Sequence, residues 1–216
     1  MKELVTMYQY EDKLWKDNID LVAGIDEVGR GPLAAGVLAC AVILDPKKSI
    51  DGLNDSKVLS EKKRRELAGI IKERAISYAY GYASQKEIDQ INIYQASKLA
   101  MLRAIKSLRQ KPEFLLIDAM PLPEADIPFL SIIKGDSLSA SIAAASIIAK
   151  VKRDEIMQIF SRIYPNYGFD QNKGYPTKVH LEALEKYGPC KLHRTTYGPV
   201  KKCFEKQLVL EGFDEI

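Results

Sequence analysis

Residues 21–44 read LVAGIDEVGRGPLAAGVLACAVIL, two apolar runs separated by a glycine-rich stretch. Turn residues bound the runs at 21–25 and 36–44, so each predicts a β-strand, and the short connection favours antiparallel pairing. Asp26 and Glu27 directly follow the first run, and Arg30 lies between two glycines. Two adjacent carboxylates bind a metal or a proton, whereas a Gly-Arg-Gly turn offers backbone N–H groups and a guanidinium to a phosphate.

The rest of the chain predicts three more strands and at least four helices. The strands are expected at residues 75–83, 114–117 and 129–133, and the helices at 60–74, 95–108, 138–160 and 177–187. Ser84 and Glu87 have the spacing of a capping box. This order predicts the α/β class, with a mixed five-stranded sheet flanked by helices and a small C-terminal helical segment.

Length and composition indicate one ordinary globular domain. The 216 residues contain no linker-like or repeated segment, so we expect a single domain over 1–216, with a core at about 20–165 and a substrate-contacting helical segment at about 166–216. Three cysteines without paired spacing favour a reducing compartment. We therefore expect a cytoplasmic monomer without a membrane or signal segment.

Two further carboxylates follow later strands. Asp118 ends the apolar run at 114–117, and Asp136 comes shortly after the run at 129–133. Together with Asp26 and Glu27 they form a quartet whose mutual repulsion requires neutralisation by cations, and oxygen ligands suit Mg²⁺ or Mn²⁺. Such a cluster favours two-metal phosphodiester hydrolysis, in which one ion activates water and another, about 4 Å away, stabilises the leaving oxygen.

The quartet depends on two geometric expectations. Successive strand residues face opposite sides, so Asp26 and Glu27 share a site only if the strand ends or bulges there, which Gly29 and Gly31 make feasible. Asp154 competes with Asp136, but one helix between them would separate the two by about 24 Å. We select Asp136 because it occupies a strand-to-helix turn, as Asp118 does, and expect Asp154 to be a structural partner of Arg153 or Lys150.

Several motifs in fixed order carry a family resemblance across nearly the whole chain. They are GIDEVGRGPLAA at 24–35, LNDSK at 53–57, LID at 116–118, GDS at 135–137, SIAAASI at 141–147, KGYPT at 173–177 and HR at 193–194. The chain thereby resembles type 2 ribonuclease H, the bacterial ribonuclease HII. The resemblance implies a ribonuclease H-like fold, Mg²⁺ or Mn²⁺ dependence and hydrolysis of the RNA strand in RNA–DNA hybrids. It also implies nicking 5′ of single ribonucleotides in duplex DNA, leaving 3′-hydroxyl and 5′-phosphate ends.

The resemblance also implies roles for individual residues. The family's four acids fall on Asp26, Glu27, Asp118 and Asp136. Its phosphate-gripping loop falls on Gly29-Arg30-Gly31, which together with Tyr175 is expected to recognise the step from a ribonucleotide to DNA. Ala35 stands where the family often has glycine, and the twenty N-terminal residues match no motif.

Basic side chains near the C-terminal motifs are candidates for substrate contacts. We expect Lys57, Lys173 and Arg194 to contact phosphates, which would make binding salt-dependent. His180 and His193 are too few and too far apart in sequence for a metal ligand set, and we interpret them as structural or phosphate-adjacent. Recruitment by a replication clamp is left open by the sequence.

Two rival functions use the same residues. A dinucleotide-binding oxidoreductase would explain Gly29-x-Gly31-x-x-Ala34, but a strand follows that loop where the motif needs a helix, and the acid pair would repel a pyrophosphate. A nucleic-acid-binding module without catalysis would explain the basic residues and predicts binding without divalent metal. The complete acid quartet favours the nuclease.

Overall fold

The computed structural model describes residues 7–211, with side chains described up to residue 205. The elements are α1 (Gln9–Lys16), β1 (Val22–Val28), β2 (Val37–Ile43), α2 (Glu61–Arg74), β3 (Ser77–Ala83), α3 (Gln85–Lys106), β4 (Phe114–Asp118), η1 (Pro123–Ala125), β5 (Phe129–Ile132), η2 (Gly135–Ser137), α4 (Ala140–Ile163), η3 (Pro165–Tyr167), α5 (Phe169–Asn172), α6 (Lys178–Tyr187) and α7 (Gly198–Glu211).

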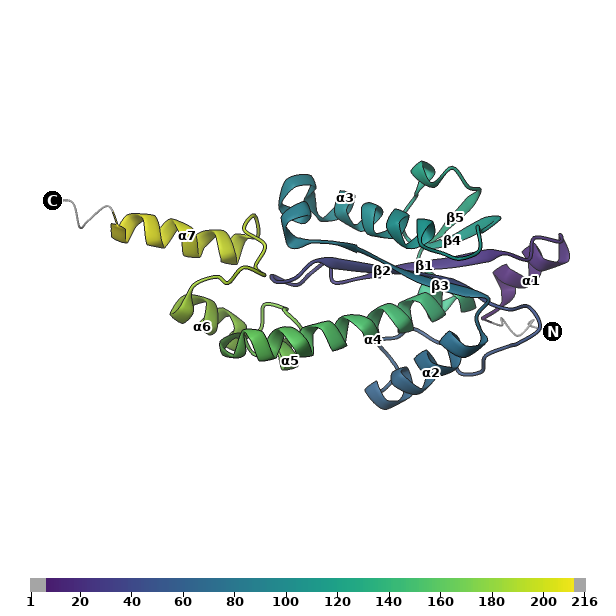
Figure 1. Cartoon of the computed structure of the whole chain (residues 1–216), viewed down its shortest axis with the longest axis horizontal. Coiled ribbons are helices and arrows are strands. Elements are labelled where there is room, and N and C mark those ends of the chain that lie inside the picture. The colour runs from purple at the N-terminus through teal and green to yellow at the C-terminus, as the bar shows by residue number, and fades with distance from the viewer. Residues whose placement is uncertain (1–6, 212–216) are drawn as a thin grey trace. The chain divides into compact units, whose positions relative to one another are not determined.

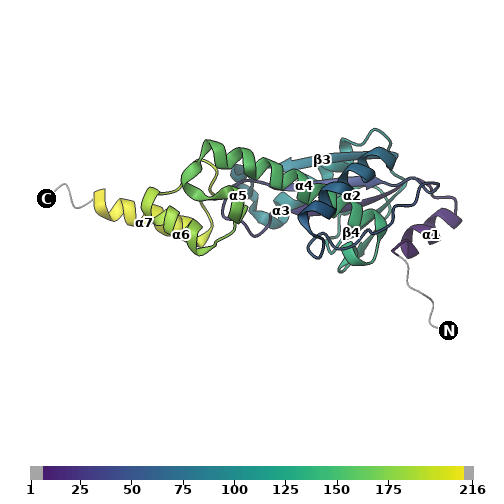
Figure 2. The same cartoon turned by 90° about the horizontal axis from the view of Figure 1, so that it is seen from below.

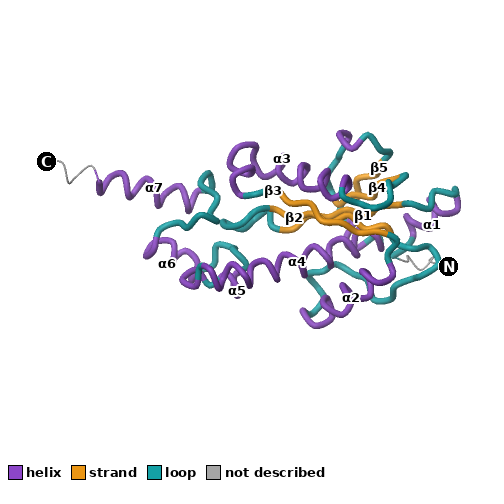
Figure 3. The backbone as a smooth tube through the Cα atoms, viewed as in Figure 1, coloured by secondary structure: helices purple, strands orange, loops and turns teal. Residues whose placement is uncertain are grey.

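The strands form one mixed sheet in the order β3-β2-β1-β4-β5 (Figure 3). β1 pairs antiparallel with β2, and both the β1–β4 and β4–β5 pairs are parallel. The short loop after β1 accounts for the antiparallel pair, whereas the parallel pair of β1 and β4 requires the long helical connection between them. The predicted α/β class and five-stranded mixed sheet are confirmed.

The chain forms two compact units. Unit 1 contains the described residues up to Val28, together with Leu38–Tyr82 and Ser97–Lys152. Unit 2 contains Gly29–Val37, Ala83–Ala96 and the described residues from Arg153 onward. Each unit is described separately below.

In unit 1, helices cover both faces of the sheet (Figure 1). α2 and α4 lie beside one another on one face, as Figures 1 and 2 show. On this face side chains of β2, α2 and the first half of α4 form one buried cluster. α3 lies on the other face, where a Cβ at Gly81 of β3 would meet the Ala100 carbonyl oxygen at 1.9 Å. The alanines at the start of α4 belong to the buried cluster on the first face, where their small side chains let the helix pack closely on the sheet.

Gly24 sets the distance between β1 and α4. A Cβ at this position would come within 2.0 Å of the Ser141 carbonyl carbon and 2.4 Å of the Ile142 nitrogen. Val22, two residues earlier in β1, packs with Ile142 in a second buried cluster. Because alternate strand residues share a face, Val22, Gly24 and Asp26 all face α4.

α1, which matched no motif, is anchored to the start of α4. The Glu11 carboxylate is buried and accepts hydrogen bonds from the Ser139 hydroxyl at 2.6 Å and the Ser141 N–H at 2.9 Å. The Ala140 N–H donates to the Met7 carbonyl at 2.7 Å. These contacts satisfy N–H groups that a helix leaves without intrahelical partners in its first turn.

Unit 2 has cores of its own. One cluster joins the 34–35 segment to Met157 of α4 and to the aromatic pair Tyr167 and Phe169, whose rings stack at 5.4 Å. A smaller cluster joins Leu33, Leu184 and Val200. Thr177 caps α6 by accepting a hydrogen bond from the His180 N–H, so the predicted helix at 177–187 is confirmed to within one residue.

The sequence-based end of β1 is wrong, because β1 does not end or bulge at Asp26 but pairs regularly with β2 to Val28. α3 begins at Gln85, after the confirmed Ser84–Glu87 capping box, with a first helical stretch that the sequence did not predict. Asn92 interrupts it with φ 65°, and its side chain accepts from the Tyr94 and Gln95 N–H groups, so the predicted start at 95 marks a second helical stretch.

Among the described residues, no helix combines the length and the apolar composition needed to cross a bilayer.

The contact at Gly24 predicts a large difference between two glycine-to-alanine substitutions. Gly24→Ala should lower the free energy of unfolding by about 3 kcal/mol or more, because the added methyl group would push the α4 backbone away from β1. Gly69→Ala, in α2 with no atom within 4 Å of the added methyl group, should raise it by up to about 1 kcal/mol. Denaturant unfolding of both variants measures the two effects, and equal stabilities would contradict this account.

Candidate functional site

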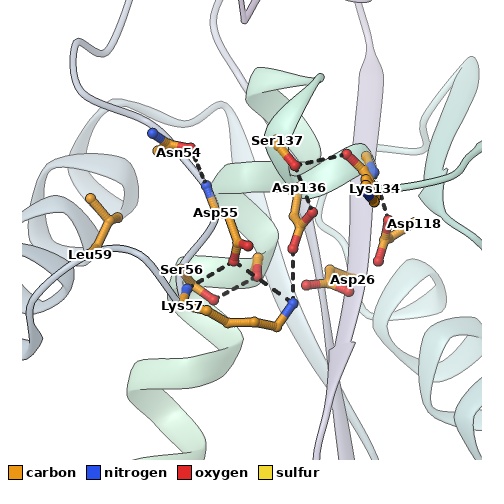
Figure 4. A network of polar contacts seen from close by, with 12 residues as sticks. Asp26, Asn54, Asp55, Ser56, Lys57, Leu59, Asp118, Lys134, Asp136 and Ser137 are labelled. Atoms are coloured by element: carbon orange, nitrogen blue, oxygen red, sulfur yellow. Dashed lines mark hydrogen bonds and ion pairs between the residues drawn. The ribbon is translucent and has the colours of Figure 1, made fainter.

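The register of the parallel strands brings Asp26 and Asp118 together. β1 and β4 pair from Val22↔Phe114 to Ile25↔Ile117, so the next residue of each strand is an aspartate. Residues at the same level of parallel strands face the same side, and Asp26 faces α4. The two aspartates therefore lie side by side on the α4 face, in unit 1 (Figure 4).

A hydrogen bond connects Asp118 to the turn that carries Asp136. After β5, Lys134 adopts a left-handed conformation with φ 58° and reverses the chain into η2. The Gly135 N–H then donates to Asp118 Oδ1 at 2.7 Å. Asp136, the next residue, is 5% exposed. The turn thus places a third carboxylate beside the first two.

The loop at residues 54–59 adds a positive charge to these acids. Lys57 Nζ lies 3.2 Å from Asp136 Oδ2 and 3.8 Å from Asp55 Oδ1 (Figure 4). The loop is held to α4 by a 3.0 Å contact between the Ser56 and Ser146 hydroxyls. The Ser146 hydroxyl also favours the charged form of the Asp26 carboxyl and so opposes the rise in its pKa. Loop, helix and strand are thus joined through polar side chains.

The acids perturb one another electrostatically. Burial raises the pKa of Asp26 well above its usual range, and the charges of Glu27 and Asp118 raise it further. Burial also raises the pKa of Asp118, with Asp136 adding to the effect and the hydrogen bond from Gly135 opposing it. Burial lowers the pKa of Lys57, but its hydrogen bond and charge interaction with Asp136 produce a net rise. A net negative cluster partly neutralised by one ammonium results.

Glu27 takes a different direction from the three aspartates. Because β1 continues through it without a bulge, strand alternation directs Glu27 to the face opposite Asp26. The pairing with β4 has ended two residues earlier, at Ile25, so β4 does not flank β1 at this level. Across the described residues, no three His, Cys, Asp or Glu side chains are placed to hold a metal ion as they stand.

The Gly29-Arg30-Gly31 loop belongs to unit 2, where it meets Tyr175. Gly29 has φ 99°, a conformation that glycine adopts without strain, and a Cβ there would come within 2.6 Å of the Arg153 guanidinium. A Cβ at Gly31 would lie 3.2 Å from Cε1 of the Tyr175 ring. Tyr175 is 44% exposed, so the aromatic ring and the glycine backbone together form an accessible surface.

Arg194 has a different role from the predicted phosphate contact. Its side chain is fully buried, and its guanidinium donates to the carbonyls of Gly29 at 2.5 Å, Arg30 at 2.8 Å and Ala35 at 2.9 Å. Further bonds reach the Tyr197 hydroxyl and the Gly36 carbonyl. These bonds use all five N–H groups of the guanidinium, which leaves none for a phosphate. The prediction for Arg194 is therefore corrected: it positions the glycine loop.

Comparison with known proteins identifies the family. The sequence profile described as Ribonuclease HII matches residues 23–200. A ribonuclease HII of Caldanaerobacter subterraneus subsp. tengcongensis is 51% identical over 197 residues, which cover 91% of this chain and 82% of that protein. The chain belongs to the ribonuclease HII family. It is a type 2 ribonuclease H, an endoribonuclease that acts on RNA–DNA hybrids.

Solved structures agree with this assignment of the ribonuclease HII chain. The ribonuclease H2 of Pyrococcus horikoshii OT3 superposes with a TM-score of 0.73 at 27% identity, covering 86% of this chain and 97% of that one. A ribonuclease HII of Archaeoglobus fulgidus, solved in a complex with PCNA, gives 0.70 at 26% identity, covering 82% and 95%. The predicted ribonuclease H-like fold is thereby confirmed.

Two uncharged residues of this ribonuclease HII, Ser56 and Ser146, also belong to the site, although sequence reasoning from charged side chains did not select them. Ser56 and Ser146 hold the loop at residues 54–59 to α4 beside Asp26, and both serines lie within motifs of the family resemblance. Their small hydroxyls gave no chemical signal of their own. Asp154, which we set aside in favour of Asp136, is buried in the part of α4 that belongs to unit 2.

The raised pKa of Asp26 predicts a pH-dependent effect on stability. In chelator, Asp26→Asn should raise the free energy of unfolding by on the order of 1–3 kcal/mol at about pH 8, because it removes a buried charge among like charges. A carboxyl whose folded-state pKa is raised favours folding as pH falls, so the advantage of the variant should narrow toward about pH 5. Thermal unfolding at both pH values measures this, with Asp51→Asn at an exposed position as the control. An advantage that grows at low pH would contradict the assignment.

Proposed function

We propose that this ribonuclease HII uses divalent metal ions held by Asp26, Glu27, Asp118 and Asp136 to cleave RNA in RNA–DNA hybrids. We further propose that it nicks on the 5′ side of single ribonucleotides in duplex DNA, leaving 3′-hydroxyl and 5′-phosphate ends. The observation that carries the proposal is the meeting of Asp26, Asp118 and Asp136 on one sheet face around the Lys57 ammonium.

The donor set fits a hard cation. All four side chains offer carboxylate oxygens, which Mg²⁺ and Mn²⁺ prefer. Burial is the main cause of the raised pKa values of Asp26 and Asp118, neighbouring acids raise them further, and Lys57 offsets this negative charge only in part. The charge of Glu27 already raises the pKa of Asp26, and Glu27 would join the site by turning its side chain around β1, beyond the last pair of β1 with β4. When bound, the ions supply activation of the attacking water and stabilisation of the departing oxygen.

The chain's own residues prepare this site in three ways. Gly135 orients Asp118 by a hydrogen bond, and the Ser146 hydroxyl favours the charged form of Asp26. Burial of Asp26 and Asp136 keeps water away from the acids and strengthens their attraction for a cation. Lys57 is held at Asp136; a cation bound to that oxygen would release the ammonium, which would then be available to a phosphate.

In unit 2, Gly29-Arg30-Gly31 and Tyr175 have the features of a sugar-reading surface. The 2′-hydroxyl distinguishes RNA from DNA, and backbone groups of glycine can approach it closely. The exposed Tyr175 ring beside Gly31 would stack against the following deoxyribose and disfavour an extra hydroxyl there. Lys57 and Lys173 are proposed phosphate contacts, which a salt-dependent affinity for hybrid would support.

Asp136→Asn tests the metal-dependent nuclease. With Mn²⁺ or Mg²⁺, we expect the parent to nick a duplex that contains one ribonucleotide and the variant to lose at least about 10²-fold in rate, because a charged ligand is removed. EDTA should abolish the activity of the parent. Gel analysis of end-labelled duplex measures both effects, and Asp51→Asn serves as the control. If the parent binds the duplex but does not nick it with either metal, the protein is a binding module and not a nuclease. If Asp136→Asn nicks at a near-normal rate, Asp136 is not a ligand of the metal.

Tyr175→Ala tests the sugar-reading role. The ratio of kcat/KM for one embedded ribonucleotide to kcat/KM for a continuous hybrid should fall by about ten-fold or more, because an aromatic stacking contact is worth roughly 1–3 kcal/mol. Tyr187→Ala, which removes another exposed tyrosine of unit 2, should leave the ratio unchanged. A Tyr175→Ala enzyme that kept the full ratio would exclude the role.

A further inference from the structure

Two buried histidines of unit 2 contact each other through their rings. His180 Nε2 and His193 Nε2 lie 3.0 Å apart, and both side chains are buried. At one end of the pair, the Cys190 N–H donates to His193 Nδ1 at 2.9 Å. At the other end, His180 Nδ1 lies 2.9 Å from the carbonyl oxygen of Tyr175. The pair therefore connects the backbone at Cys190 with the backbone at Tyr175.

The protonation states of the four ring nitrogens follow from the fixed groups at the two ends. Cys190 N–H is a donor, so His193 Nδ1 is an acceptor and the proton of that neutral ring is on Nε2. His193 Nε2–H then donates to His180 Nε2, which puts the proton of His180 on Nδ1. His180 Nδ1–H donates to the Tyr175 carbonyl, which is an acceptor. One arrangement of two neutral rings thus satisfies the bond from the Cys190 N–H, the bond between the rings and the bond to the Tyr175 carbonyl in the same direction; the longer 3.3 Å approach of His193 Nδ1 to the Cys190 carbonyl is not a hydrogen bond in this arrangement.

The surroundings favour two neutral rings. Burial lowers the pKa of His193 to about 4, and the neighbouring His180 lowers it as well. Burial also lowers the pKa of His180. Both rings contact the stacked pair of Tyr167 and Phe169, with centroids 5.0–6.4 Å apart. This aromatic packing holds the planes of the two imidazole rings and so fixes the direction of their hydrogen bonds.

Consecutive residues hold the two parts of the sugar-reading surface. His193, through His180, reaches the backbone of Tyr175, while Arg194 binds the carbonyls of Gly29 and Arg30. The Leu33 N–H also donates to the Gly174 carbonyl at 2.7 Å. The separation between the Tyr175 ring and Gly31 therefore depends on this backbone bond together with the contacts made from His193 and Arg194.

We propose that the His180–His193 pair positions Tyr175 against Gly31 and thereby sets the preference of the enzyme for a ribonucleotide followed by DNA. The proposal rests on the proposed function, because it assumes that Tyr175 reads the sugar. The histidines are positioning residues: both are buried, and they act through the Tyr175 carbonyl.

Two substitutions of His180 each keep one of its two side-chain hydrogen bonds and remove the other. An asparagine amide can take the place of the Nδ1 edge and keep the bond to the Tyr175 carbonyl, whereas a glutamine amide reaches the Nε2 position and keeps the bond to His193. We expect His180→Gln to lower the ratio of kcat/KM for one embedded ribonucleotide to that for a continuous hybrid by about three- to ten-fold, the worth of one hydrogen bond. His180→Asn should keep a ratio close to that of the parent.

Tyr167→Phe is the matched control. It removes the hydrogen bond from the Tyr167 hydroxyl to the Gly188 carbonyl in the same aromatic core but leaves both histidines in place. It should lower stability without changing the ratio. If His180→Gln does not fold, His180→Leu gives a second test, because it also removes the donor to the Tyr175 carbonyl, and the same fall in the ratio is expected.

The outcomes separate this proposal from the proposed function. If Tyr175→Ala lowers the ratio but His180→Gln or its substitute does not, the histidine pair has no positioning role. Equal losses in His180→Asn and His180→Gln, or a loss in Tyr167→Phe, would also overturn it, because they would indicate a general effect of the core. If Tyr175→Ala itself keeps the ratio, the sugar-reading function fails instead.

Discussion

The close approach of α4 to β1 at Gly24 is the constraint on which the rest of unit 1 depends. No Cβ fits between the strand and the Ser141 backbone, so helix and sheet are in van der Waals contact at this point. Two residues further along β1, Asp26 meets Ser146, which lies four residues beyond Ile142 on α4. A strand rises about 3.3 Å per residue and a helix about 1.5 Å, so these spacings of two and four residues cover about the same distance. The packing of α4 on β1 at Gly24 therefore also sets the position of Ser146 beside Asp26 in the site.

The same geometry makes the site costly to fold. Asp26 and Asp136 are buried, and like charges around Asp26 raise its pKa beyond the effect of burial alone. Evolution of stability alone would replace such groups by apolar ones. Their presence beside the close approach of α4 to β1 indicates that tight packing there tolerates a local electrostatic cost. The glycine loop in unit 2 is built differently, with its carbonyls held by a buried guanidinium and its surface left accessible.

The sequence predicted much of the fold because its apolar runs are short, distinct and bounded by turn residues. It predicted the location of Asp118 and Asp136 correctly, at or just after strands, and register then explains their meeting with Asp26. The course of β1 beyond Ile25 was not predictable, because charged residues end an apolar run whether or not the strand continues. Arg194 was misjudged for a related reason: five carbonyl and hydroxyl acceptors satisfy a guanidinium as well as a phosphate does, and backbone carbonyls leave no trace in a sequence. α1 was missed because Glu11 looks like any surface acid until its contact with α4 is known.

Lys57 gives the acid cluster a counter-ion that is part of the chain. Its ammonium lies 3.2 Å from Asp136 Oδ2, and the lysine side chain is 78% exposed to solvent. Many metal sites form only when the ion arrives, so that metal uptake and folding are one event. Here a covalently attached ammonium supplies part of the neutralisation of the acid cluster from within the fold. At the proposed metal site, ion binding would then be a step separate from folding.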